Sequence, residues 1–335
     1  MAVNNVNLPS LIDVANRTDP DGKIGAVVEI LNETNEVNED AVWLEANNGT
    51  THKTIVRTGI PSATWRQLNY GVMPTKSTTV PVLDSCGMLE TYSEVDKSLA
   101  DLNGNTAEFR LSEDRAFLEG MSQQFADTLF YGNTTLNPER FMGLAPRFNS
   151  LSAESGSNII SGAGTGSTNA SIWLMVWGPN TVHCLYPKGS KAGLQHTDKG
   201  VVTKENAGGV SGAMMEIYRT HYKWDVGLTV KDWRYVVRGA NIKVGDLVKN
   251  GATGADLIDM MAQMIEMLPS GALSGGGKPV FYMPRVIRSF LRRQINNKSN
   301  VNLNQQEVGG KTVMTFDDIP CRRSDALLST EVQVS

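Results

Sequence analysis

Four residues, Gly309, Gly310, Lys311 and Thr312, match the end of a nucleotide-binding P-loop. In a P-loop the lysine and the hydroxyl group hold phosphate and magnesium, a first glycine shapes the loop, and a helix follows. Position 305, where the first glycine would stand, is a glutamine, and the residues VMTF after Thr312 are typical of a strand. We therefore predict a strand edge at Lys311 and no nucleotide binding.

Metal ligation is not predicted either, because the cysteines and histidines lack the short spacings that hold a zinc ion. A calcium loop at 19–22, Asp-Pro-Asp-Gly, fails because Arg17 and Val28 would occupy its first and last ligand positions. The sequence also contains no Gly-x-Ser-x-Gly and no His-Glu-x-x-His motif. We expect no metal, no cofactor and no catalytic site. The side chains considered for a metal are Cys86, Cys184, Cys321, His183, His196 and His221.

Two adjacent carboxylates, Asp317 and Asp318, are the remaining pair that could act as a general acid and base. They stand between two short segments that alternate like strands, and aspartate is common where the chain turns between strands. We predict a hairpin turn at this pair.

The composition restricts the class of protein. The 335 residues are 40% hydrophobic, enough to fill a core in about two domains, and the net charge of −4 provides no overall positive field for nucleic acid. The first residues contain no apolar signal segment, and the densest apolar stretch, at 172–177, is too short to span a bilayer. We expect a soluble, unexported protein that is made in a reducing cytoplasm and has no membrane contact.

Two segments before residue 85 are predicted to extend from the body. Residues 1–43 combine a polar start, a short helical pattern at 24–31 and an acidic stretch, which together predict an arm with one small helix. Residues 54–82 show β-branched alternation broken by glycine and proline, with apolar side chains among polar neighbours. Two interpretations fit them: an extended hairpin that projects from the body, or an ordinary surface loop. The apolar side chains are Trp65, Leu68 and Tyr70.

The strongest helical pattern covers 111–131 and has apolar side chains every three to four residues. Ser112 is expected to cap its N-terminus and Gly132 its C-terminus. Such a helix would be about 30 Å long and could form the spine of a domain. The residues expected on its buried face are Leu118, Met121, Phe125 and Leu129.

Apolar alternation at 172–183 and 226–237 predicts two long strands that flank a glycine-rich segment, which favours a β-ribbon. From residue 253 a second block begins, with Thr253 and Asp256 as a capping box at the start of a helix. For the methionine stripe at 260–267, packing in a core is favoured over an adaptable groove for a partner. The buried stripe expected for this helix is Leu257, Met261, Met264 and Leu268.

A strand at 280–283 and a helix after Pro284 complete this block, because proline is tolerated at a helix start. Between 267 and 306 the chain has no acidic residue, so the helix carries unbalanced arginines. They could touch DNA, but pairing with an acidic segment of another copy is favoured because the same chain carries one. The residues proposed to pair are Arg285, Arg288, Arg292 and Arg293 on one copy, and Glu36, Glu39 and Asp40 on another.

Taken together, several segments resemble the major capsid proteins of tailed bacteriophages with the Hong Kong 97-type fold, most closely those of short-tailed, epsilon15-like phages. The resemblance covers nearly the whole chain from about residue 43. It rests on WRQLNYGV, on FYGN followed by FMGLAPRFNS, on SIWLMVWGPNTVHCLYPKGSKAGL, on VKDWRYVVRGANI and on TFDDIPCRRSDALLSTE. It implies an α+β fold and self-assembly into the hexamers and pentamers of an icosahedral head that encloses double-stranded DNA.

The resemblance also implies a division of the chain into four parts. Placing the A-domain last departs from the familiar family order and implies a permuted connectivity. No residue matches the lysine–asparagine cross-link of some relatives, which implies a non-covalent shell. Trp65, Leu68 and Tyr70 are the expected anchors of the E-loop on a neighbour. The parts are an N-terminal arm at 1–43, an E-loop at 44–85, a P-domain at 86–251 with a spine helix at 111–131, and an A-domain at 252–335.

The partners implied are many copies of the same chain, a cement or decoration protein, a portal, a scaffold and packaged DNA contacted without sequence specificity. The protein would then be part of the virion and be synthesised in the cytoplasm of the host bacterium. An encapsulin-like nanocompartment shell is the alternative, and neighbouring genes for terminase, portal and tail would distinguish the two. A third hypothesis is an enzyme in the glycine-rich C-terminal block, which ATP turnover by a small oligomer would favour.

Overall fold

The computed structural model describes residues 8–9, 33, 35–104, 106–207, 210–248, 254–271, 276–296, 303–308 and 311–335. Within these ranges the chain has a mixed α+β fold whose thirteen strands join one sheet. The predicted helix at 24–31, Thr253 of the expected capping box, and Gly309 and Gly310 lie outside the described residues. The α-helices are α2 (Val37–Asp40), α3 (Lys97–Ala100), α4 (Thr106–Tyr131), α5 (Leu257–Glu266) and α6 (Arg285–Asn296). The strands are β1 (Trp43–Glu45), β2 (Thr51–Gly59), β3 (Thr78–Asp96), β4 (Ile159–Ser161), β5 (Asn169–Trp177), β6 (Val182–Tyr186), β7 (Gln195–Glu205), β8 (Met214–Val230), β9 (Val236–Lys243), β10 (Lys278–Met283), β11 (Leu303–Val308), β12 (Lys311–Phe316) and β13 (Ile319–Arg323).

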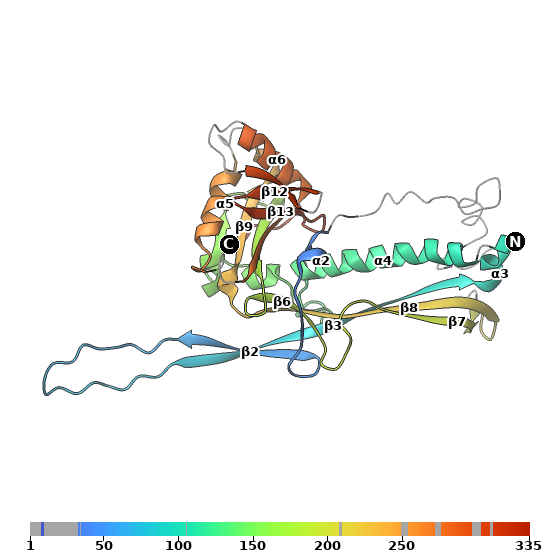
Figure 1. Cartoon of the computed structure of the whole chain (residues 1–335), viewed down its shortest axis with the longest axis horizontal. Coiled ribbons are helices and arrows are strands. Elements are labelled where there is room, and N and C mark those ends of the chain that lie inside the picture. The colour runs from blue at the N-terminus through green and yellow to red at the C-terminus, as the bar shows by residue number, and fades with distance from the viewer. Residues whose placement is uncertain are drawn as a thin grey trace.

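The molecule has three parts that extend in different directions (Figure 1). A compact lobe contains α5, α6, β5, β9, β10, β12 and β13. A long arm contains α4, β7, β8 and the second half of β3, and a hairpin formed by β2 and the first half of β3 points the opposite way. Because β3 belongs to both the hairpin and the arm, its 19 residues connect these two parts as one strand.

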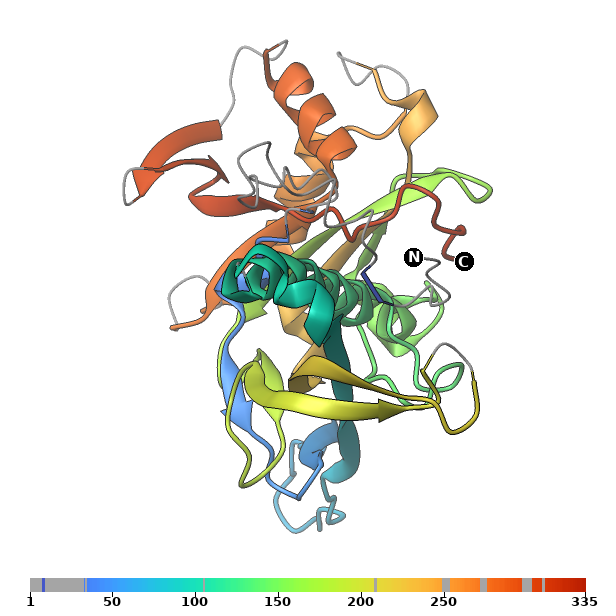
Figure 2. The same ribbon diagram turned by 90° about the vertical axis from the view of Figure 1, so that its right-hand side faces the viewer.

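In the arm, residues 86–96 of β3 pair antiparallel with residues 217–227 of β8, and β7 pairs with the other edge of β8. Figure 2 looks along the arm and shows α4 lying over this layer of strands. A salt bridge of 2.8 Å from Arg110 on α4 to Asp198 on β7 joins helix and sheet. The arm is therefore one helix on one narrow sheet, with a single thin layer of contacts between them.

The spine helix α4 was predicted in the right place but too short. It runs over Thr106–Tyr131, so Ser112 lies inside the helix and the prediction that it caps the N-terminus was wrong. The extra turns form because Phe109 is buried with Val95 and Ala100 in a small cluster at the end of the arm. At 26 residues the helix is about 39 Å long.

The second half of α4 holds the helix to the body. Met121, Phe125 and Leu129 are buried, as predicted, whereas Leu118 is 36% exposed, so only part of the expected face is covered. The chain leaves the helix at Gly132, where a Cβ atom would meet backbone oxygens at 2.4 and 2.5 Å. A glycine is thus required at this close approach, in agreement with the predicted end of the helix.

The lobe is built on both faces of β5, whose nine residues are all buried. Trp173 and Trp177 pack in the core that includes the second half of α4, while Ile172 and Leu174 pack in the core beneath α5 and α6. Alternate residues of one strand therefore fill two cores, as the period of a strand dictates. One of these two cores is shared with the arm, because it also contains residues of α4 and β8.

Helix α5 covers one of these cores with its methionine-rich face, which confirms core packing over a partner groove. Asp256 is the N-cap itself, because its carboxylate accepts the backbone N–H groups of Ile258 and Asp259. The expected capping box had placed Asp256 inside the helix, and that detail was wrong. The buried stripe is Leu257, Met261, Met264 and Leu268, as predicted.

Each of the two predicted long strands is divided. The segment 172–183 contains the end of β5 and the start of β6, and 226–237 contains the end of β8 and the start of β9, with a 3₁₀ turn at Trp233–Tyr235 between them. The two segments do pair, through β5 with β9 and through β6 with β8. The glycine-rich segment between them contains β7, which pairs antiparallel with β8. The β-ribbon is therefore formed by this segment and β8, and not by the two predicted strands alone.

Two further predictions near the end of the chain are confirmed. Lys311 begins β12, so a strand and not a helix follows the P-loop-like residues. Asp317 and Asp318, with φ of 49° and 62°, form the turn between β12 and β13. Positive φ at both central residues matches the twist of a tight hairpin.

Candidate assembly surfaces

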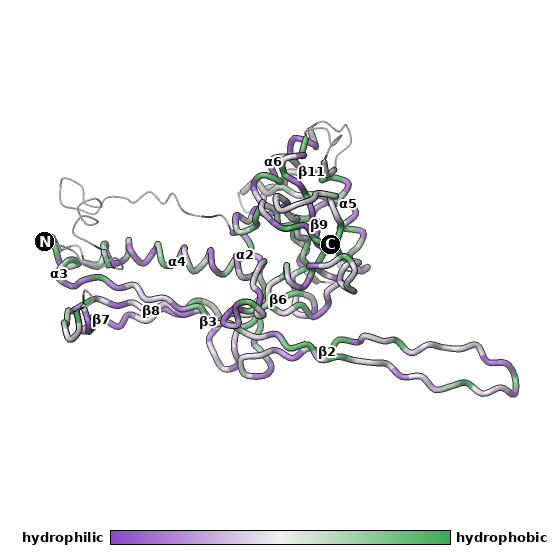
Figure 3. The backbone as a smooth tube through the Cα atoms, turned by 180° about the vertical axis from the view of Figure 1, so that it is seen from behind, coloured by the Kyte–Doolittle hydropathy of each residue, from purple (hydrophilic) through white to green (hydrophobic). Residues whose placement is uncertain are grey.

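The hairpin presents its predicted anchor residues to solvent. β2 and β3 pair antiparallel along its base, which confirms the hairpin over an ordinary surface loop, and residues 60–77 form the tip. Trp65, Leu68 and Tyr70 at the tip are exposed by 101%, 87% and 70%. Figure 3 shows hydrophobic and hydrophilic segments interspersed along the whole hairpin. Large apolar side chains so fully exposed on a projecting element are typical of a protein interface.

Polar contacts at the root fix the direction of the hairpin. Asp84 on β3 is buried and accepts a 2.7 Å salt bridge from Arg147, which also donates to the carbonyl oxygen of Leu228 on β8. One arginine therefore holds the strand that enters the hairpin to the strand that enters the arm. Breaking such a buried pair leaves a charge without compensation, which costs more than losing an exposed pair.

Two buried histidines lie beside this ion pair. The rings of His52 on β2 and His183 on β6 meet edge to face with centroids 5.6 Å apart. Burial, with a smaller contribution from Lys231, lowers the pKa of both, and that of His183 falls to about 4. Both imidazoles are therefore neutral at pH 7, and their protonation would place charge in the root of the hairpin.

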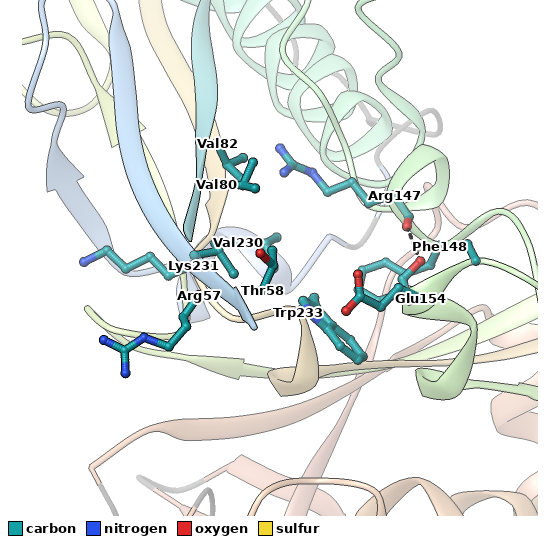
Figure 4. A pocket seen from close by; sticks show the side chains of 13 residues that line it. Arg57, Thr58, Val80, Val82, Arg147, Phe148, Glu154, Val230, Lys231 and Trp233 are labelled. Atoms are coloured by element: carbon teal, nitrogen blue, oxygen red, sulfur yellow. Dashed lines mark hydrogen bonds between the residues drawn. The ribbon is translucent and has the colours of Figure 1, made fainter. Parts of the chain in front are cut away.

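A pocket of about 430 Å³ separates the hairpin from the lobe at this root (Figure 4). Val80 and Val82 of the hairpin face Val230 and Trp233 across it, while Arg57 extends away from the valines. Among the described residues, the hairpin therefore contacts the rest of the chain near its base, and its outer part extends away from the lobe (Figure 1).

The acidic residues predicted to meet another copy are mostly occupied within their own chain. Asp40 in α2 is buried and accepts hydrogen bonds from Tyr282 at 3.1 Å and from Arg322 at 3.0 and 3.1 Å, and it also binds Lys278. Glu36 contacts the same arginine at 3.4 Å. Glu39 alone of the three is exposed. This network attaches α2 to β10 and β13, so Asp40 and Glu36 already have partners within their own chain.

The predicted arginines gather in one place. Arg285, Arg288, Arg292 and Arg293 of α6 line an open pocket of about 440 Å³ together with Arg323 of β13. Arg285 pairs with Asp325, and Arg323 approaches the same carboxylate at 4.0 Å. The sequence had identified the helix but not the fifth arginine, which comes from 30 residues further along the chain.

The sequence did not reveal the charged network that holds the last residues of the chain. Glu331 is buried, accepts a 2.8 Å salt bridge from Arg238 of β9 and a 2.5 Å hydrogen bond from Tyr131 of α4, and also contacts Ser171 of β5. Burial and the neighbouring carboxylate raise the pKa of Tyr131. The sequence did contain an indication of this network: Arg238 stands inside the apolar run YVVRGANI, and a buried arginine needs a buried partner.

The cysteines considered as metal ligands are wholly or partly buried within the fold. Burial raises the pKa of the Cys86 thiol to about 11 and that of the Cys321 thiol to about 12, which keeps them protonated and unreactive at neutral pH. Across the described ranges, no group of three or more His, Cys, Asp or Glu could hold a metal ion. Among the described helices, none is both long and apolar enough to cross a membrane.

Comparisons with known proteins identify the family of the chain. The family model for major capsid protein GP7 matches residues 19–335. A chain in the cryo-EM structure of bacteriophage epsilon15 is 44% identical, with a TM-score of 0.77, and the match covers 100% of this chain and 99% of that one. No curated protein sequence matches.

Two other matches are more distant. The capsid of a native GTA particle is 9% identical, with a TM-score of 0.46 over 67% of this chain and 95% of that one. The holo-SrpI encapsulin complex of Synechococcus elongatus is 14% identical, with a TM-score of 0.43 over 70% of this chain and 97% of that one. At these scores neither carries an argument, so the nanocompartment alternative gains no support.

The family model spans almost the whole chain, and the identity to the epsilon15 protein extends over its full length. The Hong Kong 97-type fold and the resemblance seen in the sequence are thus confirmed. The chain therefore belongs to the family of major capsid protein GP7, whose members are structural components of the phage virion.

Proposed function

We propose that many copies of this chain close into the hexamers and pentamers of an icosahedral head around double-stranded DNA, with the hairpin of each copy lying on a neighbour. The observation that supports this arrangement best is the tip of the hairpin, where Trp65, Leu68 and Tyr70 are exposed beyond the reach of the chain's own cores. Tryptophan and tyrosine are enriched among the side chains that dominate binding at interfaces. They serve here as anchors in a contact between copies.

The shape of the chain supports the same mechanism. A two-stranded hairpin alone is marginally stable in water, so its outer part gains from a second surface. An extended element that crosses a neighbour also buries more area than two compact bodies touching side by side, and stable interfaces bury about 1,200–2,000 Å² in total. Because the contact is between different surfaces of identical copies, it can repeat around a ring and close.

The division of the chain is proposed in a modified form. β3 runs without interruption across the expected boundary at 85–86, so the E-loop and the P-domain share one strand. Residues 252–335 share a core with β5 and β9, so we assign these strands to the A-domain as well. The A-domain is then formed by two segments of the chain, β5 before the arm strands β7 and β8, and β9 with residues 252–335 after them. This interruption is the permutation that we propose.

Further partners belong to the same proposal. A portal, a scaffold and a cement or decoration protein are expected because a closed head must be nucleated, sized and reinforced. No catalytic role is proposed, because the buried charged residues hold elements of the fold together. The DNA contacts are proposed to be independent of base sequence.

The experiment that tests the proposed function removes the anchors. The triple variant Trp65→Ala, Leu68→Ala, Tyr70→Ala should remain folded and monomeric, because these side chains touch little of their own chain. Its shell yield, measured by electron microscopy and sedimentation velocity, should fall by about tenfold or more if the tip carries hot-spot contacts. Leu136→Ala is the matched control, since Leu136 is 76% exposed on a loop outside the hairpin. Normal shells from the triple variant would contradict the proposal.

A further inference from the structure

The arginine pocket of α6 is a concentrated positive surface without a matching negative one. Its lining consists of Arg285, Arg288, Arg292, Arg293, Arg323 and Ser289, so no acidic side chain lies among the lining residues. Helix α6, which carries four of these arginines, lies at the end of the lobe farthest from the hairpin (Figure 1). A net charge of −4 for the whole chain makes this local cluster the exception to the overall balance.

Within the described part of the chain, the charge of the pocket is only partly compensated. Asp325 pairs with Arg285 and approaches Arg323 at 4.0 Å, and Glu33 adds a weaker electrostatic interaction with Arg285. Arg288, Arg292 and Arg293 form no ion pair with a described residue, and Arg293 lies over the ring of its own neighbour, Phe290, at 5.0 Å. Three guanidinium groups therefore keep their donors available for a ligand.

The stability of the helix does not explain this placement. Arg285 and Arg288 lie in the first turn of α6, where the helix dipole is positive and a cation is unfavourable. The same end of the helix favours an anion. The first turn itself contains no acidic residue, and Asp325 relieves the repulsion at Arg285 from outside the helix. An external anion bound across this turn would offset it.

The acidic residues first expected to pair with the arginines of another copy mostly form ion pairs within their own chain. Asp40 is buried against Lys278, Tyr282 and Arg322, and Glu36 also contacts Arg322. What is left of that segment is Glu39, a single exposed carboxylate, which cannot balance three free guanidinium groups. The contents of the head offer a denser anion, because double-stranded DNA carries one charge per about 1.7 Å of its axis.

We propose that the arginine pocket of α6 binds the phosphate backbone of double-stranded DNA and thereby attaches the shell to its contents. This inference rests on the proposed function, since it assumes a head that encloses DNA. From Arg285 to Arg293 the helix spans about 12 Å, a length of duplex that carries about seven phosphate charges. The planar guanidinium groups of arginine can donate two hydrogen bonds to the oxygens of one phosphate, which suits this pocket to the DNA backbone. The binding is independent of sequence.

The test measures duplex binding by unassembled, full-length subunits. Fluorescence anisotropy with two unrelated DNA duplexes of about 20 base pairs, over a series of KCl concentrations, gives the affinity and its salt dependence. In the variant Arg292→Gln, Arg293→Gln the affinity should fall by about tenfold at low salt, and the slope of log K against log [KCl] should become about two units shallower, equally for both duplexes. The control Arg115→Gln, Lys199→Gln removes the same charge from exposed sites on the arm and should change neither value.

Three outcomes would overturn the inference. One is an unchanged salt slope in the pocket variant, and another is an equal loss in the control, which would mean that only net charge matters. The third is a pocket variant that binds duplex normally but no longer forms shells, which would assign the pocket to an acidic surface of a neighbouring copy. Shell formation is scored separately by electron microscopy, so a failure of the proposed function is distinguishable from a failure of DNA binding. Thermal unfolding of the variant should match the native chain and shows that the fold is retained.

Discussion

In the lobe, Trp173, Met261 and Phe281 are completely buried by their own chain, whereas in the hairpin Trp65 and Leu68 are almost completely exposed. The two regions carry comparable apolar side chains, but only one of them has a core. Fully burying a large apolar side chain contributes about 1.5–3 kcal/mol. The lobe gains this free energy when one chain folds, and the hairpin can gain it only when copies meet.

The contrast extends to the charged residues. In the lobe, buried pairs such as Arg238 with Glu331 connect elements that are distant in the sequence. At the surface, Arg288 and Arg292 remain without an acidic partner among the described residues. Paired buried charges thus lie where the chain stabilises its own fold. We expect the arginines without an acidic partner to contact another molecule, which we propose is DNA.

The largest effect is expected from breaking the lobe itself. Glu331→Ala removes the carboxylate that compensates the buried Arg238 and that accepts the hydroxyl of Tyr131. A buried charge left unpaired costs about 3–5 kcal/mol, so the free energy of unfolding of the subunit should drop by that amount in urea titrations. Thr330→Ala, at the exposed neighbouring position, should change it by less than about 0.5 kcal/mol. Equal stabilities of the two variants would refute the role of Glu331.

A smaller effect is expected at the root of the hairpin when the pH falls. The pKa of His183 is about 4 in the folded chain against an ordinary value of 6.5, because burial disfavours the charged ring. The unfolded chain therefore binds the proton first, and stability is lost as the pH drops from about 6.5 towards 4, by about 2 kcal/mol at pH 5. Unfolding titrations at pH 7 and 5 measure this loss.

The variant His183→Gln provides the control for this pH effect, because glutamine does not titrate. Its loss of stability between pH 7 and 5 should be smaller than that of the native chain by the same amount. If both chains lose equal stability, other groups such as His52 or the buried carboxylates account for the acid sensitivity, and the assignment to His183 fails.

Sequence patterns were sufficient for the elements that depend on local periodicity. Most of the apolar stripe of α4, the stripe of α5, the strand after Lys311 and the turn at Asp317 follow from spacing within a few residues. The start of α4 was missed because it depends on Phe109 packing against residues of β3 and α3, which the pattern of the helix alone does not contain.

Local sequence patterns could not predict which charged residues pair with each other. The hydrogen bond between Arg322 and Asp40 joins residues separated by 282 positions, so only the fold brings them together. The same distance explains why Asp40 was proposed as a contact with another copy, since the sequence shows an acidic segment and a basic segment but not which of them meet. The resemblance to phage capsid proteins identified the family, and the structure was needed to separate internal ion pairs from free ones.

Hydrogen–deuterium exchange of free subunits and of assembled shells tests the central contrast most directly. In free subunits, amides of residues 60–77 should exchange rapidly while those of β5 are protected, because only the lobe strand is buried within its own chain. In shells, the tip should become protected while the protection of β5 stays the same. A tip that is already protected in the free subunit, or one that still exchanges rapidly in the shell, would contradict the account.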